Sequence, residues 1–288
     1  MSNIQIIVDS SCDIPQERLE ELDLVLLPLT ILFGEEQFVD YKEMNDTKFC
    51  QMLKSSKAHP TTAQVTSDQA QVALKKCLDN KKEILAITIS SVGSGTYSAL
   101  HIAKRNLEEE AGHELPIRII DSRAFTTLYA LAVYDAVKMR DSGASLNEIA
   151  EATEKSCNDG RYAFLALFTD LNFLKKGGRL KAGTALICGI LGIMPILTIE
   201  DGLVIPKGKA RGFDNANDVL IGFMKDDCPS GKIKRLHIIH NGLEDKIKKF
   251  IDLVKQNFEV GTIDIGHPFG TIMTHSGKDF LVFSYDKD

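Results

Sequence analysis

Short apolar runs alternate with helical patterns along the first half of the chain. The runs Ile4–Val8, Ile84–Ile89 and Ile117–Ile120 contain few polar residues, as expected of strands covered on both faces of a parallel sheet. Apolar positions at helical spacing occupy Thr66–Asn80 and Thr96–Glu110 between these runs. This rhythm of strands and helices predicts a parallel α/β sheet.

The pattern changes near residue 160. Strands are predicted at Tyr162–Phe168, Met194–Glu200 and Leu203–Lys207, and Asp201-Gly202 between the last two is a hairpin signal. Two more helices and three more strands follow, at Asn215–Met224, Leu243–Phe258, Leu236–Ile239, Ile263–Ile265 and Phe280–Phe283. We therefore expect two α/β domains, residues 1–160 and 161–288. The boundary is approximate, and the segment near residues 60–80 is free to pack with the second domain.

Polar residues mark several expected element ends. Asp13 is predicted to cap a helix that holds Pro15 in its first turn. Thr66 is expected to cap the helix that follows it, and Ser145 with Glu148 forms a capping box. If His275 has only a structural role, it is expected to be a satisfied histidine at the end of a strand.

Composition excludes some classes of protein. The 288 residues carry a net charge of −6, which argues against nucleic acid or an anionic membrane as the main partner. The six cysteines show no metal-binding or disulfide-scaffold spacing, so they are expected to be reduced thiols in a cytoplasmic protein. The longest apolar run, Ala185–Leu197, is shorter than the roughly 20 residues of a spanning helix. It is expected to be buried or to line an apolar cavity.

The segment from Ser90 to Tyr97 is a candidate anion site. It follows a buried strand and opens a helix, so its glycines and the free N–H groups of the helix suit a phosphate or a carboxylate. Ser94 and Thr96 add hydroxyl donors. A simple turn with a helix cap is the alternative. The segment lacks the Gly-Lys-Ser/Thr of a P-loop and the glycines of a nucleophile elbow around Ser94.

Three more polar positions are candidates for the same chemistry. Thr62 lies in a hydroxyl-rich loop before a helix, Arg179 follows a double glycine, and His275 stands between two hydroxyl residues. An arginine that turns inward can hold a carboxylate. A capping loop, an exposed arginine and a structural histidine are the respective alternatives. No metal site is expected, because Cys, His, Asp and Glu show no ligand spacing.

Taken together, these segments resemble the DegV family of bacterial fatty-acid-binding proteins. Ser90–Tyr97 is close to the family's S-S-x-L-S-G-T-Y, and Leu171–Leu180 is similar to its L-x-x-L-x-x-G-G-R-I. Gly189–Leu197 and His240-Asn241-Gly242 match two further motifs. The chain departs from the family pattern at Ala63 and Val65, at Gly93, and at Lys278-Asp279.

The resemblance implies a two-domain α/β fold, with a parallel sheet in the N-terminal domain and a mixed sheet in the C-terminal domain. It implies a carrier, not an enzyme, that holds a long-chain fatty acid such as palmitate, stearate or oleate and needs no cofactor. Thr62, Ser94 and Gly95 would bind the carboxylate, with Arg179 and His275 completing the polar network. The tunnel candidates are Ile190, Leu191, Ile193 and Met194.

The resemblance also implies a protein partner. Family members of one type, the lipid-carrier subunits of fatty acid kinase, present the carboxylate to a separate kinase that forms an acyl phosphate for phospholipid synthesis. Arg211 matches a surface arginine implicated in docking that kinase. Transient membrane contact is compatible with this role. The alternatives are an enzyme, either a phosphotransferase or a hydrolase, and a binding protein for another small anion.

Overall fold

A four-stranded parallel sheet forms the N-terminal half, as the sequence predicts. The computed structural model of the chain describes residues 3–181 and 192–288. The strands follow the order β2-β1-β6-β7, with bounds β1 Ile4–Asp9, β2 Leu24–Leu27, β6 Glu83–Thr88 and β7 Ile117–Asp121. One face packs against α3 (Ser67–Asp79) and α4 (Thr96–Ala111), and the other against α5 (Thr126–Asp141) and α6 (Leu146–Asn158).

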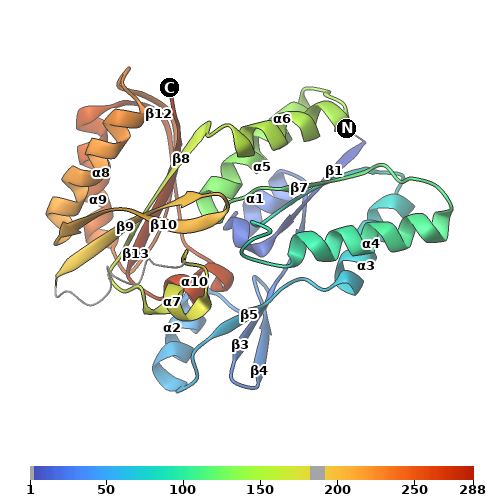
Figure 1. Cartoon of the computed structure of the whole chain (residues 1–288), viewed down its shortest axis with the longest axis horizontal. Helices are drawn as coiled ribbons and strands as arrows, with labels where there is room; N and C mark the ends of the chain where they lie inside the picture. Colours follow the sequence, from blue (N-terminus) through green and yellow to red (C-terminus); the bar gives the residue numbers. More distant parts are fainter. Residues whose placement is uncertain (1–2, 182–191) are drawn as a thin grey trace.

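A six-stranded mixed sheet forms the C-terminal half (Figure 1). Its order is β10-β9-β8-β13-β11-β12, with bounds β8 Tyr162–Phe168, β9 Ile193–Glu200, β10 Leu203–Arg211, β11 Lys232–Asn241, β12 Glu259–Gly266 and β13 Phe280–Asp286. Neighbouring strands are antiparallel except β11 and β12. Helices α8 (Phe213–Asp227) and α9 (Glu244–Asn257) cover one face. The predicted mixed α/β architecture is confirmed.

Helix α5 joins the two sheets. Ten of its sixteen residues are buried, so it has no single apolar face, as expected of a helix enclosed on several sides. Tyr129 and Val133 pack on the parallel sheet, whereas Leu131 and Ala132 pack with Tyr162 of the mixed sheet. Its buried Thr127 shares a hydrogen bond of 2.8 Å with Ser284 of β13. The two halves therefore share a continuous packed interior.

A small third sheet was not anticipated from the sequence. The apolar stretch Leu24–Phe33 divides at Pro28 into two strands, β2 and β3 (Thr30–Phe33). Strand β3 pairs with β4 (Glu36–Val39) and β5 (Thr61–Ala63), and α2 (Asp46–Ser55) lies between these last two in the sequence. This unit packs on α10 (Gly270–Ser276) from the other end of the chain, with Ile31 and Phe49 against Met273. In Figure 1 it lies below α7 (Asn172–Gly177) and α10.

Two predictions about local structure are wrong. Asp13 does not cap α1 (Gln16–Glu21), which begins after Pro15 without a side-chain cap. The Asp13 carboxylate is instead fully buried and accepts hydrogen bonds from Phe269 N (2.8 Å) and Thr126 Oγ1 (2.6 Å). His275 lies on the short helix α10 and not near the end of a strand. The caps at Thr66 and Ser145 are confirmed, both as complete capping boxes.

In the described part of the chain, no helix is both long enough and apolar enough to cross a bilayer.

An arginine links α5 to the mixed sheet. Arg235 of β11 lies 2.7 Å from Asp135 of α5 and 2.7 Å from Asp286 of β13, and all three side chains are at most 21% exposed. Burial alone would raise the pKa of Asp135 and lower that of Arg235. The hydrogen bond from Tyr162 and the contacts with Arg235 instead lower the pKa of Asp135, and the two carboxylates raise the pKa of Arg235. The arginine therefore compensates two carboxylates that are largely removed from water.

We predict that Arg235→Ala lowers the free energy of unfolding by about 3 kcal/mol, because Asp286 loses its arginine partner and Asp135 keeps only Arg161, at 3.2 Å. Urea denaturation at neutral pH measures this. Arg118→Ala is the control, since Arg118 is bonded at the surface to Asn147, and its loss should cost less than about 0.5 kcal/mol. Equal losses in the two variants would contradict the prediction.

Candidate functional site

A cavity lies between the two sheets, beyond the carboxyl ends of β1 and β6. Strand β1 is followed by β2 on one side and by β6 on the other, and this reversal of direction opens a crevice where α/β proteins commonly bind ligands. The empty space is about 670 Å³ including the part open to solvent. The described lining residues are Leu29, Thr62, Ile89, Gly93, Ser94, Phe125, Thr126, Phe164, Ala166, Phe168, Leu174, Arg179, Ile199, Val204, Thr271, Ile272, His275, Ser276 and Val282.

Most of the cavity wall is apolar and comes from the mixed sheet. Phe164, Ala166 and Phe168 occupy alternate positions of β8, so their side chains share the face that looks toward the cavity. The intervening Leu165 and Leu167 pack on the opposite face against α8 and α9. Such a wall offers no hydrogen bonds to a ligand, and it suits a long hydrocarbon.

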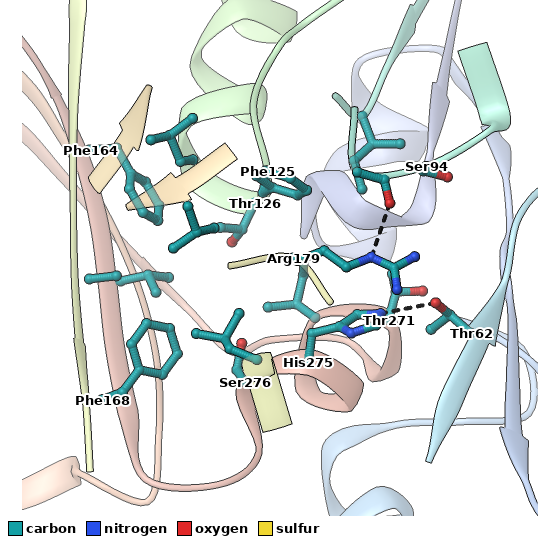
Figure 2. Close-up of a pocket in the computed structure, with 18 of the residues that line it drawn as sticks. Thr62, Ser94, Phe125, Thr126, Phe164, Phe168, Arg179, Thr271, His275 and Ser276 are labelled. Carbon is teal, nitrogen blue, oxygen red and sulfur yellow. Dashed lines mark hydrogen bonds between the residues drawn. The ribbon is translucent and has the colours of Figure 1, made fainter. Parts of the chain in front are cut away.

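One end of the cavity is polar. Thr62 from β5, Ser94 from the loop before α4, Arg179 from the turn after α7, and His275 from α10 all line it. Figure 2 shows these four on the side of the cavity opposite Phe164 and Phe168. The fold thus brings together four polar residues that the sequence singled out from widely separated segments.

His275 is held so that one ring nitrogen faces Thr62. Its Nε2 lies 3.0 Å from Thr62 Oγ1 (Figure 2), while Nδ1 is buried with no hydrogen-bond partner among the described residues. A Cβ on Gly177 would come within 2.4 Å of Nδ1, so only glycine allows the ring this close. Burial, with the nearby charge of Arg179, lowers the pKa of His275 to about 3. The imidazole is therefore neutral at physiological pH.

Arg179 supplies the positive charge of the polar end. Its Nε donates to the carbonyl of Gly93 at 3.0 Å, and its Nη1 donates to the carbonyl of Gly177. Gly178, which precedes it, ends α7 in the left-handed conformation with φ 71°. Burial lowers the pKa of Arg179, but a guanidinium stays protonated at neutral pH. The side chain thus ties the loop before α4 to the turn after α7.

Ser94 lies at the start of a long helix. Gly95 is the N-cap of the sixteen-residue α4 and offers no side-chain cap. The first N–H group of the helix, that of Thr96, donates to Ser94 Oγ at 3.4 Å, and the next N–H groups of the first turn have no partner within the helix. Ser94 Oγ lies 3.1 Å from Thr96 Oγ1. A Cβ on Gly95 would collide with the Gln64 side chain at 1.9 Å, so glycine lets the loop approach β5 closely. Hydroxyls and the positive end of the helix together favour an anion here.

Two buried carboxylates support the cavity wall from behind. Asp40 accepts hydrogen bonds from Gly270 N at 3.0 Å, Thr271 N at 3.1 Å and Thr271 Oγ1 at 2.5 Å, and Asp13 accepts from Thr126 Oγ1. Burial raises the pKa of both acids, although these hydrogen bonds partly offset it. Thr126 and Thr271 both line the cavity, so the two acids fix the orientation of the hydroxyls there.

The predicted tunnel residues are not part of the described wall. Ile190 and Leu191 lie outside the described residues, and neither Ile193 nor Met194 lines the cavity. Met194 packs with the cluster beneath α8, because alternate residues of β9 face opposite sides. Ile199, five positions further along, does line the cavity.

Arg211 is exposed at the end of β10 and does not line the cavity. Asn215 Nδ2 donates to its backbone carbonyl at 2.8 Å.

Sequence reasoning missed several lining residues. The alternation of Phe164, Ala166 and Phe168 was a readable signal, because a strand with bulky residues at every second position has a distinct face. Thr126 and Thr271 carried no such signal, since their place depends on Asp13 and Asp40 from distant segments.

The fold and the cavity define a class: a two-sheet α/β protein with a largely apolar cavity that ends in hydroxyl, guanidinium and imidazole groups. The family model described as "Uncharacterised protein, DegV family" matches residues 3–288. The chain belongs to the DegV family. A DegV domain-containing protein of Clostridium acetobutylicum is 32% identical over 290 residues, covering 100% of both chains.

Two solved structures share the fold. A DegV family protein from Thermus thermophilus, described as binding fatty acid, has a TM-score of 0.88 and 23% identity over 100% of both chains. The Fatty Acid Kinase (Fak) B3 protein of Streptococcus pneumoniae, loaded with linoleic acid, has a TM-score of 0.85 and 22% identity, also over 100% of both chains.

The pKa of His275 gives a prediction about stability and pH. Its value is about 3 in the folded protein against 6.5 ordinarily, so between these pH values only the unfolded chain takes up the proton. The contribution is complete above about pH 6.5 and is lost as the pH falls. Between pH 7 and pH 5 the lipid-free wild type should lose about 1–2 kcal/mol more than His275→Gln.

Urea denaturation of both proteins at the two pH values measures the difference. The buried carboxylates are common to both proteins, so their opposite pH dependence cancels in the comparison. An equal loss in the two proteins would show that His275 is not held neutral by burial.

Proposed function

We propose that this protein binds one long-chain fatty acid without a covalent bond, with the acyl chain between the sheets and the carboxylate at the polar end of the cavity. The observation that carries the proposal is the division of one cavity into two parts. An apolar wall from the mixed sheet leads to Thr62, Ser94, Arg179 and His275.

The hydrophobic tail supplies most of the affinity. Burying about fifteen carbons at about 0.8 kcal/mol per methylene amounts to roughly 12 kcal/mol before the entropy of association is subtracted. The polar end mainly has to avoid a penalty, because a carboxylate removed from water without partners is costly. Two hydroxyls, the start of α4 and the charge of Arg179 are suited to offset that cost.

His275 would act through Thr62. If Nε2 carries the ring proton, it donates to Thr62 Oγ1, and the threonine hydroxyl is left to donate to the ligand. A neutral imidazole fits this role, because it orients the hydroxyl without adding a second cation. His275 is thus a positioning residue in this proposal.

Related proteins support the choice of ligand. The family relative from Thermus thermophilus is described as binding fatty acid, and the relative from Streptococcus pneumoniae carries linoleic acid. The enzyme alternative has less support in the described chain, since His275 bonds to Thr62 and makes no hydrogen bond to Ser94 that would activate it as a nucleophile. A small polar anion would leave the aromatic end of the cavity unfilled.

We predict that Ser94→Ala and Thr62→Ala each weaken binding of palmitate or oleate by roughly ten- to hundredfold, because each removes a hydrogen bond to a charged group. Calorimetric titration of delipidated protein gives the dissociation constants. Ser98→Ala, an exposed serine on α4, is the matched control and should bind as the wild type does. Unchanged affinity in both site variants would refute the proposed carboxylate position.

We further propose that the bound carboxylate is offered to a separate fatty acid kinase. In that reaction a carboxylate oxygen attacks the terminal phosphorus of a nucleoside triphosphate held by the kinase, the diphosphate leaves, and an acyl phosphate forms. The name of the Streptococcus pneumoniae relative, a component of fatty acid kinase, supports such a partner. Arg211, exposed and remote from the cavity lining, is the docking candidate.

Arg211→Ala should leave fatty acid affinity unchanged and reduce the rate of acyl phosphate formation at least tenfold at sub-saturating carrier. Kinase assays with the loaded carrier measure the rate. Arg105→Ala, at an exposed position of α4, is the control for loss of one surface charge. A rate equal to that of the control would exclude Arg211 from the docking surface.

A further inference from the structure

A second hollow adjoins the apolar end of the cavity. Its empty space is about 830 Å³, much of it open to solvent. The described residues that line it are Ser122, Arg123, Ala124, Leu128, Ala132, Ser156, Cys157, Asn158, Gly160, Tyr162, Ile199, Glu200, Asp201 and Gly202. They come from the β7–α5 loop, α5, the end of α6, the start of β8 and the tip of the β9–β10 hairpin.

One side chain belongs to both spaces. Ile199 of β9 lines the acyl cavity and also the second hollow. Leu128 of α5 lines the hollow and packs against the apolar cluster of the cavity, which includes Phe164. Apolar side chains, and not a backbone strand, therefore separate the two spaces.

The same strand face continues across this partition. Phe168, Ala166 and Phe164 line the cavity, and Tyr162, two residues further along β8, lines the hollow. Alternate residues of a strand are about 6.6 Å apart, so the hollow begins one such step beyond Phe164. The second space thus adjoins the apolar part of the cavity on the side of Phe164.

The floor of the hollow is apolar and its rim is polar. Ala132 and Tyr162 form a buried cluster with Leu128 and Cys157. At the rim, the half-exposed Arg123 lies 2.8 Å from Asp201 and 3.2 Å from Asn158. A hydrocarbon end that entered from the cavity would therefore meet apolar side chains first.

We infer that Ile199 sets the upper limit of acyl chain length, and that the hollow behind it is an unused extension of the acyl site. This inference rests on the proposed function. Affinity should rise with chain length until the methyl end reaches Ile199 and should then stop rising. Removing the partition joins the two spaces, so longer chains continue to gain about fourfold per buried methylene, or about fifteenfold per two-carbon step.

The test is competition among palmitate, stearate, arachidate and behenate. Delipidated protein is given an equimolar mixture, and the bound acids are extracted and measured by mass spectrometry. The expected result is that Ile199→Ala raises the bound ratio of arachidate to stearate at least tenfold over the wild type. Ile199→Val should give a smaller rise and guards against loss of folding in the alanine variant.

Two further variants test whether a change in the bound ratio comes from opening the partition at Ile199 or only from a larger cavity. Val204→Ala enlarges the main cavity without touching the hollow, so it should leave the ratio near that of the wild type. Adding Cys157→Phe to Ile199→Ala fills the hollow and should restore the wild-type ratio.

The inference is overturned if Ile199→Ala leaves the ratio unchanged, if Val204→Ala raises it equally, or if Cys157→Phe fails to reverse it. Retention of palmitate in those experiments would leave the proposed function standing. Absence of any bound fatty acid in the wild type would instead overturn the proposed function, and this inference with it.

Discussion

The structure depends on one electrostatic constraint: a charged group at the end of an apolar cavity must find compensation inside the protein. Most of the cavity wall is apolar, so an anion at the polar end depends on the few polar groups there for compensation. Arg179 provides the only cationic side chain among the described lining residues, and His275 is held neutral by burial. Arg179 is therefore the single positive charge available to an anion at the polar end. The other groups that can bind the anion there are neutral hydroxyl groups and N–H dipoles.

That arrangement explains why buried acids sit behind the cavity. Helix α10 has seven residues, too few to be stable alone, so its position must come from tertiary contacts. Asp40 binds its first N–H groups, and Asp13 binds the N–H of Phe269 just before it. These contacts keep two desolvated carboxylates beneath the site. Burying these carboxylates costs free energy, but their hydrogen bonds hold in place the helix that carries His275.

The regular elements were largely predictable because they follow local rules. Apolar runs gave the buried strands, and Thr66 and Ser145 gave helix starts, since hydrophobic periodicity and capping act over a few residues. Asp13 and α10 were not predictable in this way. Asp13 has the local appearance of a helix cap, yet its partners are 113 and 256 residues away. No pattern near Asp13 records them.

The polar end of the site was predictable in part for a related reason. Gly95, Gly177 and Gly178 permit close approach or a left-handed turn, and such requirements leave visible motifs. The apolar wall leaves weaker traces, because many side chains can line a hydrocarbon. The sequence pointed to the long run Ala185–Leu197, whereas the described wall comes from alternate positions of β8 and from single residues of β9, β10 and β13.

The apolar wall and the polar end of the cavity also differ in burial. Phe164, Ala166, Phe168 and Val282 are almost completely enclosed, but Thr62, Ser94, Arg179 and His275 each keep some exposure. A site that hides the tail and leaves the head within reach of solvent suits a carrier better than an enzyme, which would need to enclose the reacting group.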